Sequence, residues 1–182
     1  MQGRQKIMNR MEIRLAGSGG QGVILATIIL AEAALEAGKF TAQSQSYGPE
    51  ARGGSCKAEV LVSETEIGYT KVQNPTFFMA LTQDSLEKYA KSLDRECLIL
   101  VDSSLKVPEY LNAEKVKKAP ILDTATHKVG KAFTANIVAV GAINKMLNIV
   151  TEEELKTAVL RHVPKGTEAI NEKALAEGAA LI

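Results

Sequence analysis

Hydrophobic and polar residues alternate in short runs along the first half of the chain and follow helical spacing in the second. Glu12–Ala16 alternates and then becomes apolar, which predicts a first strand. The glycine cluster Gly17–Gly22 leads directly into a predicted helix at about Gln21–Ala37, which Gly38 ends in a left-handed conformation. This helix is apolar on nearly all sides, so we expect cover on more than one face, and a partner subunit is one way to provide it.

Further strands are predicted by short apolar or alternating runs. These are Phe40–Ser46, Cys56–Ser63, Phe77–Thr82, Cys97–Val101 and Pro120–Asp123, with Thr65–Thr70 as a candidate partner of the second. A helix is expected between the third and fourth, at about Gln83–Lys91. Strands separated by helices favour a three-layer α/β domain with a largely parallel sheet flanked by helices.

The C-terminal part predicts helices. Ala135–Leu147 is rich in small and branched residues, and Thr151 with Glu154 forms a capping box before the next helix. Pro164–Gly166 breaks the chain, and a last helix runs to about Glu177. We expect a single domain over residues 11–182. Residues 1–10 are expected to be a leader or flexible N-terminus, with Met8 and Met11 both plausible starts.

Composition narrows the functional classes. Aromatic residues make up only 4% of the 182, which predicts an aliphatic core. The net charge of +1 gives no general reason to bind nucleic acid or an anionic membrane. The longest apolar run, Val23–Leu35, is too short to span a bilayer, and Met1–Arg10 lacks a signal-peptide core, so we expect a cytoplasmic protein.

The residues that usually carry catalysis or metals are sparse. Cys56 and Cys97 lie far apart, which favours two buried thiols over a metal or iron–sulfur site. His127, expected in a loop, and His162, near a helix end, have no acid or thiol at ligand spacing, and we predict no catalytic or metal-binding residue. Asp102 and the two serines after it follow a predicted strand. Two roles fit this position equally: a ligand contact at the carboxyl edge of the sheet, or a simple turn or helix cap.

The glycine cluster fits Gly-x-Gly-x-x-Gly between a strand and a helix. Its members are Gly17, Ser18, Gly19, Gly20, Gln21 and Gly22. Such a loop can bind an anion at the helix N-terminus, or serve only as a tight turn. A dinucleotide site also needs an acid about twenty residues on, and Thr41–Gln45 has none. Because this acid is missing, a stand-alone NAD- or FAD-binding protein is kept only as the alternative interpretation.

A second motif, Tyr-Gly-Pro-Glu-Ala-Arg-Gly-Gly at 47–54, has two turn signals. Glu50 and Arg52 lie between them, and the candidate residues here are Tyr47, Glu50, Arg52, Gly53 and Gly54. The planar donors of Arg52 suit a carboxylate or a phosphate. A surface turn with a Glu50–Arg52 ion pair is the plainer interpretation.

These two motifs, followed by Asn-Ile-Val-Ala-Val-Gly-Ala at 136–142, resemble the gamma subunit of 2-oxoacid:ferredoxin oxidoreductases. The resemblance covers about Met11 to the end, and the Glu-Ala-Arg-Gly-Gly form is closer to the 2-oxoglutarate branch than to the pyruvate branch. It implies a fold like domain III of pyruvate:ferredoxin oxidoreductase. In the third motif, Ala139, Gly141 and Ala142 keep a helix thin, for either an internal contact or a subunit contact.

The resemblance also implies a role. The enzyme decarboxylates a 2-oxoacid on thiamine diphosphate with Mg²⁺, reduces ferredoxin through iron–sulfur clusters and releases an acyl-CoA. These cofactors belong to other parts of the enzyme. The gamma chain would bind none of them, and would serve assembly and the CoA-facing surface. Its implied partners are alpha, beta and ferredoxin-like delta subunits, with ferredoxin reached through the holoenzyme, and the isolated chain is expected to form a homodimer.

Finally, each of the first two motifs follows a predicted strand. Consecutive parallel strands joined by a right-handed helix place such loops at one sheet edge. We therefore expect Gly17–Gly22 and Tyr47–Gly54 to lie side by side at the carboxyl edge.

Overall fold

A single six-stranded sheet organises the chain. The computed structural model describes residues 10–46 and 54–182. The strands are β1 (Arg10–Ser18), β2 (Phe40–Ser46), β3 (Ser55–Ser63), β4 (Phe77–Ala80), β5 (Leu98–Asp102) and β6 (Val116–Ala119), in the order β2-β3-β1-β4-β5-β6. The predicted leader falls on residues outside the described ones, except Arg10, which begins β1.

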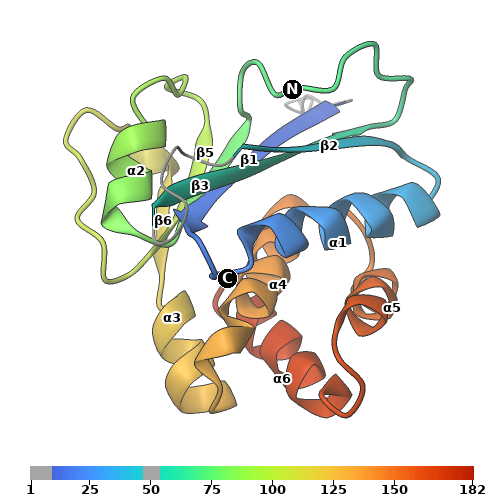
Figure 1. Cartoon of the computed structure of the whole chain (residues 1–182). Helices are drawn as coiled ribbons and strands as arrows, with labels where there is room; N and C mark the ends of the chain where they lie inside the picture. Colours follow the sequence, from blue (N-terminus) through green and yellow to red (C-terminus); the bar gives the residue numbers. More distant parts are fainter. Residues whose placement is uncertain (1–9, 47–53) are drawn as a thin grey trace, which may run out of the picture.

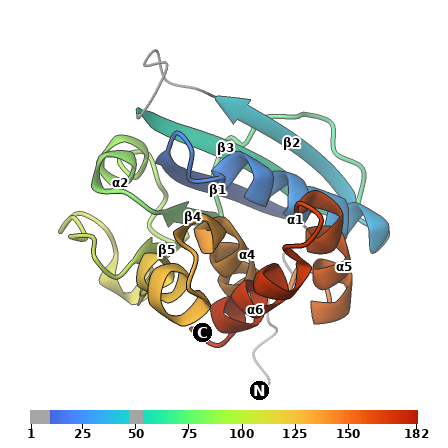
Figure 2. The same cartoon turned by 60° about the horizontal axis from the view of Figure 1, so that its bottom comes forward.

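Helices surround this sheet on both faces. The α-helices are α1 (Val23–Glu36), α2 (Gln83–Tyr89), α3 (Ile121–Asp123), α4 (Ala135–Leu147), α5 (Glu152–His162) and α6 (Glu168–Ala179). Short 3-10 segments η1 (Ala113–Lys115) and η3 (Ala132–Thr134) and a π-helical segment η2 (Thr124–Val129) complete the elements. Figure 1 shows α2 on one face and α1 with α4, α5 and α6 on the other, which confirms a three-layer α/β fold. Figure 2 shows how α4, α5 and α6 gather below the sheet.

The sheet is mixed. β1, β4, β5 and β6 form a parallel set, but β3 lies between β1 and β2 and is antiparallel to both. Parallel neighbours need a crossover of a dozen residues or more, and the stretch 47–54 between β2 and β3 is shorter than that. The chain therefore turns back after β2 and inserts β3 beside β1. The expectation of a largely parallel sheet holds on the β1–β6 side and fails on the β2–β3 side.

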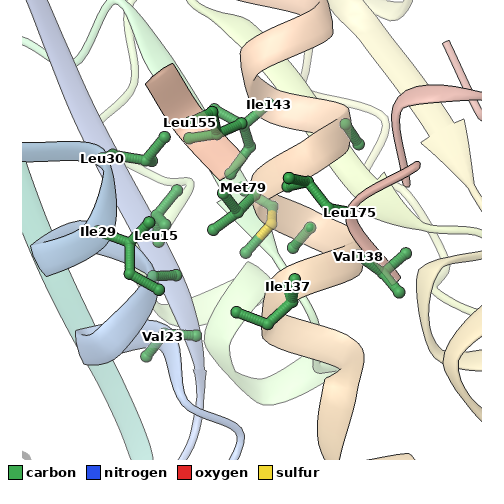
Figure 3. Packing of buried hydrophobic residues seen from close by; sticks show 14 of the residues in the cluster. Leu15, Val23, Ile29, Leu30, Met79, Ile137, Val138, Ile143, Leu155 and Leu175 are labelled. Carbon is green, nitrogen blue, oxygen red and sulfur yellow. The ribbon is translucent and has the colours of Figure 1, made fainter. Parts of the chain in front are cut away.

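Alternate residues of β1 face two separate cores. Leu15 points into the larger core beneath α1 and α4, whereas Ala16 points toward α2. In Figure 3, Leu15 and Met79 from the strands meet Ile29 of α1 and Ile143 of α4. These four side chains are aliphatic or thioether groups, but the expected aliphatic core is not free of aromatic rings, since Phe77 is buried in this core and Phe78 in the smaller one.

The α4 helix is an internal helix. Its first ten residues, Ala135–Asn144, are all buried, and α6 packs along it. A Cβ on Gly141 would overlap the carbonyl oxygen of Leu175, and a Cβ on Gly178 would overlap that of Val138. The thin surface seen in the sequence therefore serves a helix contact within the chain.

Local predictions met mixed outcomes. Gly38 is left-handed at φ 84°, and the Thr151–Glu154 capping box is present, so both predictions are confirmed. The strand predicted at Pro120–Asp123 is wrong: β6 comes just before it, and Ile121–Asp123 is helical. A run of two apolar residues after a proline fits the first turn of a helix as well as a strand. The candidate strand Thr65–Thr70 is also wrong, since that segment is irregular.

Within the described part of the chain, no helix is both long enough and apolar enough to cross a membrane.

Candidate functional site

The sheet changes direction of winding between β1 and β4. These two strands are parallel neighbours, yet α1, which follows β1, packs on one face and α2, which follows β4, packs on the other. In open α/β sheets, ligands bind at the carboxyl ends of the strands flanking such a point. The glycine loop 17–22 lies there, at the end of β1.

The glycine loop is closed by its own glutamine. The Gln21 side chain folds back so that Oε1 accepts a hydrogen bond from Ser18 N at 2.8 Å. A Cβ on Gly17 would lie 2.6 Å from that same oxygen. Gly17 is therefore a glycine because the Gln21 side chain occupies the place where a Cβ would lie.

Gly22 joins this loop to α4. It is left-handed at φ 76° and forms the N-cap of α1. A Cβ here would come 2.5 Å from Asn136 Nδ2, which donates to Gly22 O at 3.4 Å. Asn136 is buried at the first turn of α4. The first and third motifs of the sequence thus meet at this contact.

Much of the hydrogen-bonding capacity of the loop is used within the chain. Ser18 N donates to the Gln21 side chain, Gln21 N donates to Ser18 O, and Gly19 N donates to Gly54 O at 3.2 Å. A phosphate-binding loop presents its amides to the ligand instead. The geometry therefore favours a shaped turn over a cradle for several phosphate oxygens.

The second motif begins and ends at the same edge. Tyr47, Glu50, Arg52 and Gly53 lie outside the described residues. Ser46, just before them, pairs with Lys57, and Gly54, just after them, accepts the bond from Gly19. This proximity arises because β3 starts beside the end of β1.

A buried charged cluster that the sequence analysis missed lies beneath this edge. Arg14 Nε is 2.6 Å from Glu59 Oε1, with both side chains less than a tenth exposed, and Lys57 Nζ is 3.1 Å from the same oxygen. Lys57 also lies 5.9 Å from the centre of the Tyr89 ring. In the sequence, Lys57 and Glu59 stand two residues apart in a predicted strand, a spacing that places both side chains on one face. Only the register of β1 and β3, in which Arg14 pairs with Glu59, shows that Arg14 faces them.

The remaining candidates have structural partners. Asp102 is buried and accepts bonds from Ser104 N, Ser104 Oγ and Leu122 N, so it shapes a turn and fixes the start of α3. Both histidines have acid neighbours, contrary to the expectation: His127 Nδ1 lies 2.8 Å from Asp123, in the π-helical segment rather than a loop, and His162 bonds Glu32.

The cysteines are buried thiols, as expected. Burial raises the pKa of Cys56, and raises that of Cys97 to about 12. Thiolates are the form that binds metals or attacks substrates, so neither thiol is suited to those tasks at neutral pH. Across residues 10–46 and 54–182, no three His, Cys, Asp or Glu side chains cluster as metal ligands would.

The dinucleotide alternative is not favoured. A dinucleotide-binding sheet places an acidic residue at the end of the strand next to β1. Here the neighbour on that side is the antiparallel β3, and β2 itself carries no acid.

Comparison with known proteins agrees with this outcome. The family model described as pyruvate ferredoxin/flavodoxin oxidoreductase matches residues 12–181. A 2-oxoglutarate synthase subunit KorC of Methanothermobacter thermautotrophicus is 42% identical over 95% of both chains, and one of Methanocaldococcus jannaschii is 41% identical over 96% and 95%. The crystal structure of a keto/oxoacid ferredoxin oxidoreductase gamma subunit from Geobacter sulfurreducens PCA superposes with a TM-score of 0.83 at 40% identity, covering 94% of this chain and 95% of that one. The chain belongs to the pyruvate ferredoxin/flavodoxin oxidoreductase family, and among its members it is similar to the gamma-type subunits.

Proposed function

We propose that the chain is the gamma subunit of a 2-oxoglutarate:ferredoxin oxidoreductase. The observation that carries this proposal is the near-complete alignment with KorC subunits at 40–42% identity. Subunits named for ketoisovalerate or for pyruvate/ketoisovalerate enzymes match at only 30–33%. The difference supports the 2-oxoglutarate branch over the other two.

The chain's own residues support a role without redox chemistry. Iron–sulfur clusters need clustered thiolates, and the Mg²⁺ of thiamine diphosphate needs converging oxygen ligands. The described residues place no three His, Cys, Asp or Glu side chains together, and their two thiols are both buried. We assign these cofactors to the alpha, beta and delta subunits. This chain then contributes to assembly and to the surface that CoA and the partner subunits meet.

The carboxyl edge is the proposed contact surface. The glycine loop, Gly54 and the N-terminus of α1 lie together at this edge. The N-cap residue of α1 is Gly22, which has no side chain to accept hydrogen bonds from the first N–H groups of the helix. Arg52 precedes Gly54 by two residues in the sequence, and we propose it as the cation of this surface. Because several loop amides are already bonded within the chain, a single carboxylate of a partner subunit suits the edge better than the multiple phosphates of CoA.

Co-purification of the chain from its native cells, followed by mass spectrometry, tests the assignment. We expect stable recovery with a thiamine-diphosphate-dependent subunit and an iron–sulfur subunit. Recovery of the chain alone, with neither of these in any fraction, would contradict it.

An Arg52→Ala variant tests the edge itself, with Lys71→Ala as the matched control. Lys71 is exposed in the connection between β3 and β4, at the opposite edge of the sheet. In the co-expressed enzyme, Arg52→Ala should reduce subunit association or raise the Michaelis constant for CoA by about tenfold, the loss of one charged hydrogen bond. Lys71→Ala should leave both unchanged. Equal behaviour of the two variants would remove the edge from the proposal.

A further inference from the structure

Phe133 is the most exposed large hydrophobic residue in the described part of the chain, at 64%. The chain has only four phenylalanines, and two of them, Phe77 and Phe78, are fully buried. Aromatic rings gain free energy when their apolar surface leaves water, and within this chain the ring of Phe133 stays largely hydrated. Its position and its neighbours decide whether it can serve a contact with another molecule.

Phe133 lies at the carboxyl edge of the sheet. β6 ends at Ala119, so α3, η2 and η3 follow the carboxyl end of that strand. Phe133 is part of η3, which leads directly into α4, and Asn136 in the first turn of α4 donates to Gly22 O. Only three residues therefore separate the exposed ring from the contact with the glycine loop. Figure 1 shows the arrow of β1 pointing to the end of the sheet where α3 and the start of α4 lie.

The turn that carries Phe133 is held firmly. Thr134, the next residue, is fully buried, and its N–H and hydroxyl both donate to Lys131 O, at 3.0 and 2.8 Å. Before the ring, the N–H groups of Gly130 and Lys131 both donate to Ala125 O, at 3.1 and 2.9 Å. A side chain presented on a fixed backbone loses less conformational freedom when it binds. Phe133 thus has the properties of an anchor residue, because aromatic rings are enriched in the buried centres of protein interfaces.

Lys131 adds a positive charge beside the ring. It is exposed and has no ion-pair partner among the described residues, whereas the nearby Lys128 lies 3.9 Å from Glu177. The exposed residues between Lys131 and the ring, and just before them, are the small Ala132 and Gly130, which leave the ring open to an approaching surface. An apolar pocket with a carboxylate at its rim is the complementary surface.

One relative indicates which molecule carries that pocket. The ketoisovalerate oxidoreductase subunit VorA of Methanothermobacter thermautotrophicus matches 82% of this chain at 33% identity, but the match covers only 31% of VorA. In VorA the counterpart of this chain is therefore joined to a much longer remainder. Joining two domains in one polypeptide makes their contact intramolecular and raises their effective concentration. Where the two are separate chains, specific side chains are needed to hold them together.

We propose that Phe133 and Lys131 anchor this chain to the enzyme subunit that is homologous to the remainder of VorA. The ring enters an apolar pocket of that subunit, and the ammonium group pairs with a carboxylate at the rim of the pocket. The inference rests on the proposed function and names a partner contact at the same carboxyl edge. Absence of the wild-type chain from the assembled enzyme would contradict the proposed function, whereas a wild-type chain that assembles without using Phe133 would contradict the inference alone.

A competition experiment measures the contribution of each side chain. The wild-type chain and one variant, with different tags, are co-expressed with the neighbouring enzyme subunits, and complexes captured through the partner subunit are quantified by mass spectrometry. Phe133→Ala should be incorporated about thirtyfold less than wild type, the effect of losing one anchor residue. Phe133→Leu should recover part of this loss. Lys131→Ala should be reduced about two- to fivefold, and this reduction should shrink at high salt.

Leu35→Ala is the matched control. Leu35 is 59% exposed, and it lies at the end of α1 away from the glycine loop. This variant should be incorporated like wild type, and circular dichroism of each purified variant should show an unchanged fold. Equal incorporation of Phe133→Ala and wild type would overturn the proposal. Loss of Leu35→Ala in place of Phe133→Ala would also overturn it, because the contact would then lie on another surface.

A photo-cross-linking experiment identifies the partner directly. Benzoylphenylalanine replaces Phe133 in one co-expressed enzyme and Leu35 in another. After irradiation, position 133 should be cross-linked to the subunit homologous to the remainder of VorA, at apolar residues, and position 35 should not. A cross-link from position 133 to a second copy of this chain, or to any other subunit, would overturn the proposal. So would an assembled enzyme in which position 133 is cross-linked to nothing.

Discussion

Gly141 on α4 and Gly178 on α6 allow the backbones of the two helices to touch. Each glycine faces a carbonyl oxygen of the opposite helix, at Leu175 and Val138 respectively. Glycine normally weakens a helix interior, so its use here reflects the close approach of the two helices.

Either glycine replaced by alanine should therefore destabilise the fold. We expect Gly141→Ala and Gly178→Ala each to lower the free energy of unfolding by about 1–3 kcal/mol, the usual cost of overpacking. Chemical denaturation measures this. Gly68→Ala is the control, because Gly68 is exposed and a Cβ there would contact nothing within 4 Å. Equal stability of Gly141→Ala and Gly68→Ala would show that the helices can move apart without loss.

The glycine loop offers a second matched pair. Gly20 and Gly22 are both left-handed, at φ 92° and 76°, but a Cβ on Gly20 meets open space and a Cβ on Gly22 meets Asn136. Gly20→Ala should cost about 1–2 kcal/mol of unfolding free energy from backbone strain alone. Gly22→Ala should cost more, and the added Asn136→Ala change should recover part of the excess. If the two single variants lose equal stability, the Asn136 contact is not what requires glycine at position 22.

Acid should weaken the attachment of α5 to α1. The pKa of Glu32 is lowered, chiefly by its hydrogen bond to His162 and further by Arg161, against the opposing effect of burial. A carboxyl with a lowered folded pKa contributes stability above its ordinary value of 4.5, and this is lost as the pH falls through the folded pKa. Glu32→Gln should therefore be less stable than wild type at pH 7, and the gap should close below pH 4.5.

Thermal unfolding of both proteins across that range measures the gap. Glu64→Gln, which removes an exposed carboxylate paired with Lys39, is the control. A gap that stays constant with pH would mean that the Glu32–His162 bond does not contribute in this way.

Glu12 holds the connection between β3 and β4. Its buried carboxylate accepts hydrogen bonds from Tyr69 Oη and from the backbone N–H groups of Gln73 and Asn74, at 2.8–2.9 Å. Glu12→Gln should weaken these bonds by about 1–3 kcal/mol in total, since bonds to a charged acceptor are the stronger ones. Hydrogen exchange at the Gln73 and Asn74 amides should accelerate more than at amides in the core of β4. Unchanged exchange at both amides would show that the carboxylate does not hold this segment.

The sequence predicted local features well because they depend on residues close in the chain. The capping box at Thr151 and the left-handed Gly38 each follow from the chemistry of one turn. Pairing across the sheet depends on residues far apart, which explains why the insertion of β3 beside β1 was missed. The same limit applies to the site: the glycine motif was evident, but the contacts of Gly22 with Asn136 and of Gly19 with Gly54 join distant segments.

The most direct test of the enzyme assignment is a subunit-omission assay. The chain would be co-expressed with the enzyme subunits encoded beside it, and ferredoxin reduction measured with 2-oxoglutarate, pyruvate and 2-oxoisovalerate, each with and without CoA. We predict CoA-dependent reduction that is fastest with 2-oxoglutarate and that is lost when this chain is omitted. Full activity without the chain, or a preference for pyruvate or 2-oxoisovalerate, would contradict the account.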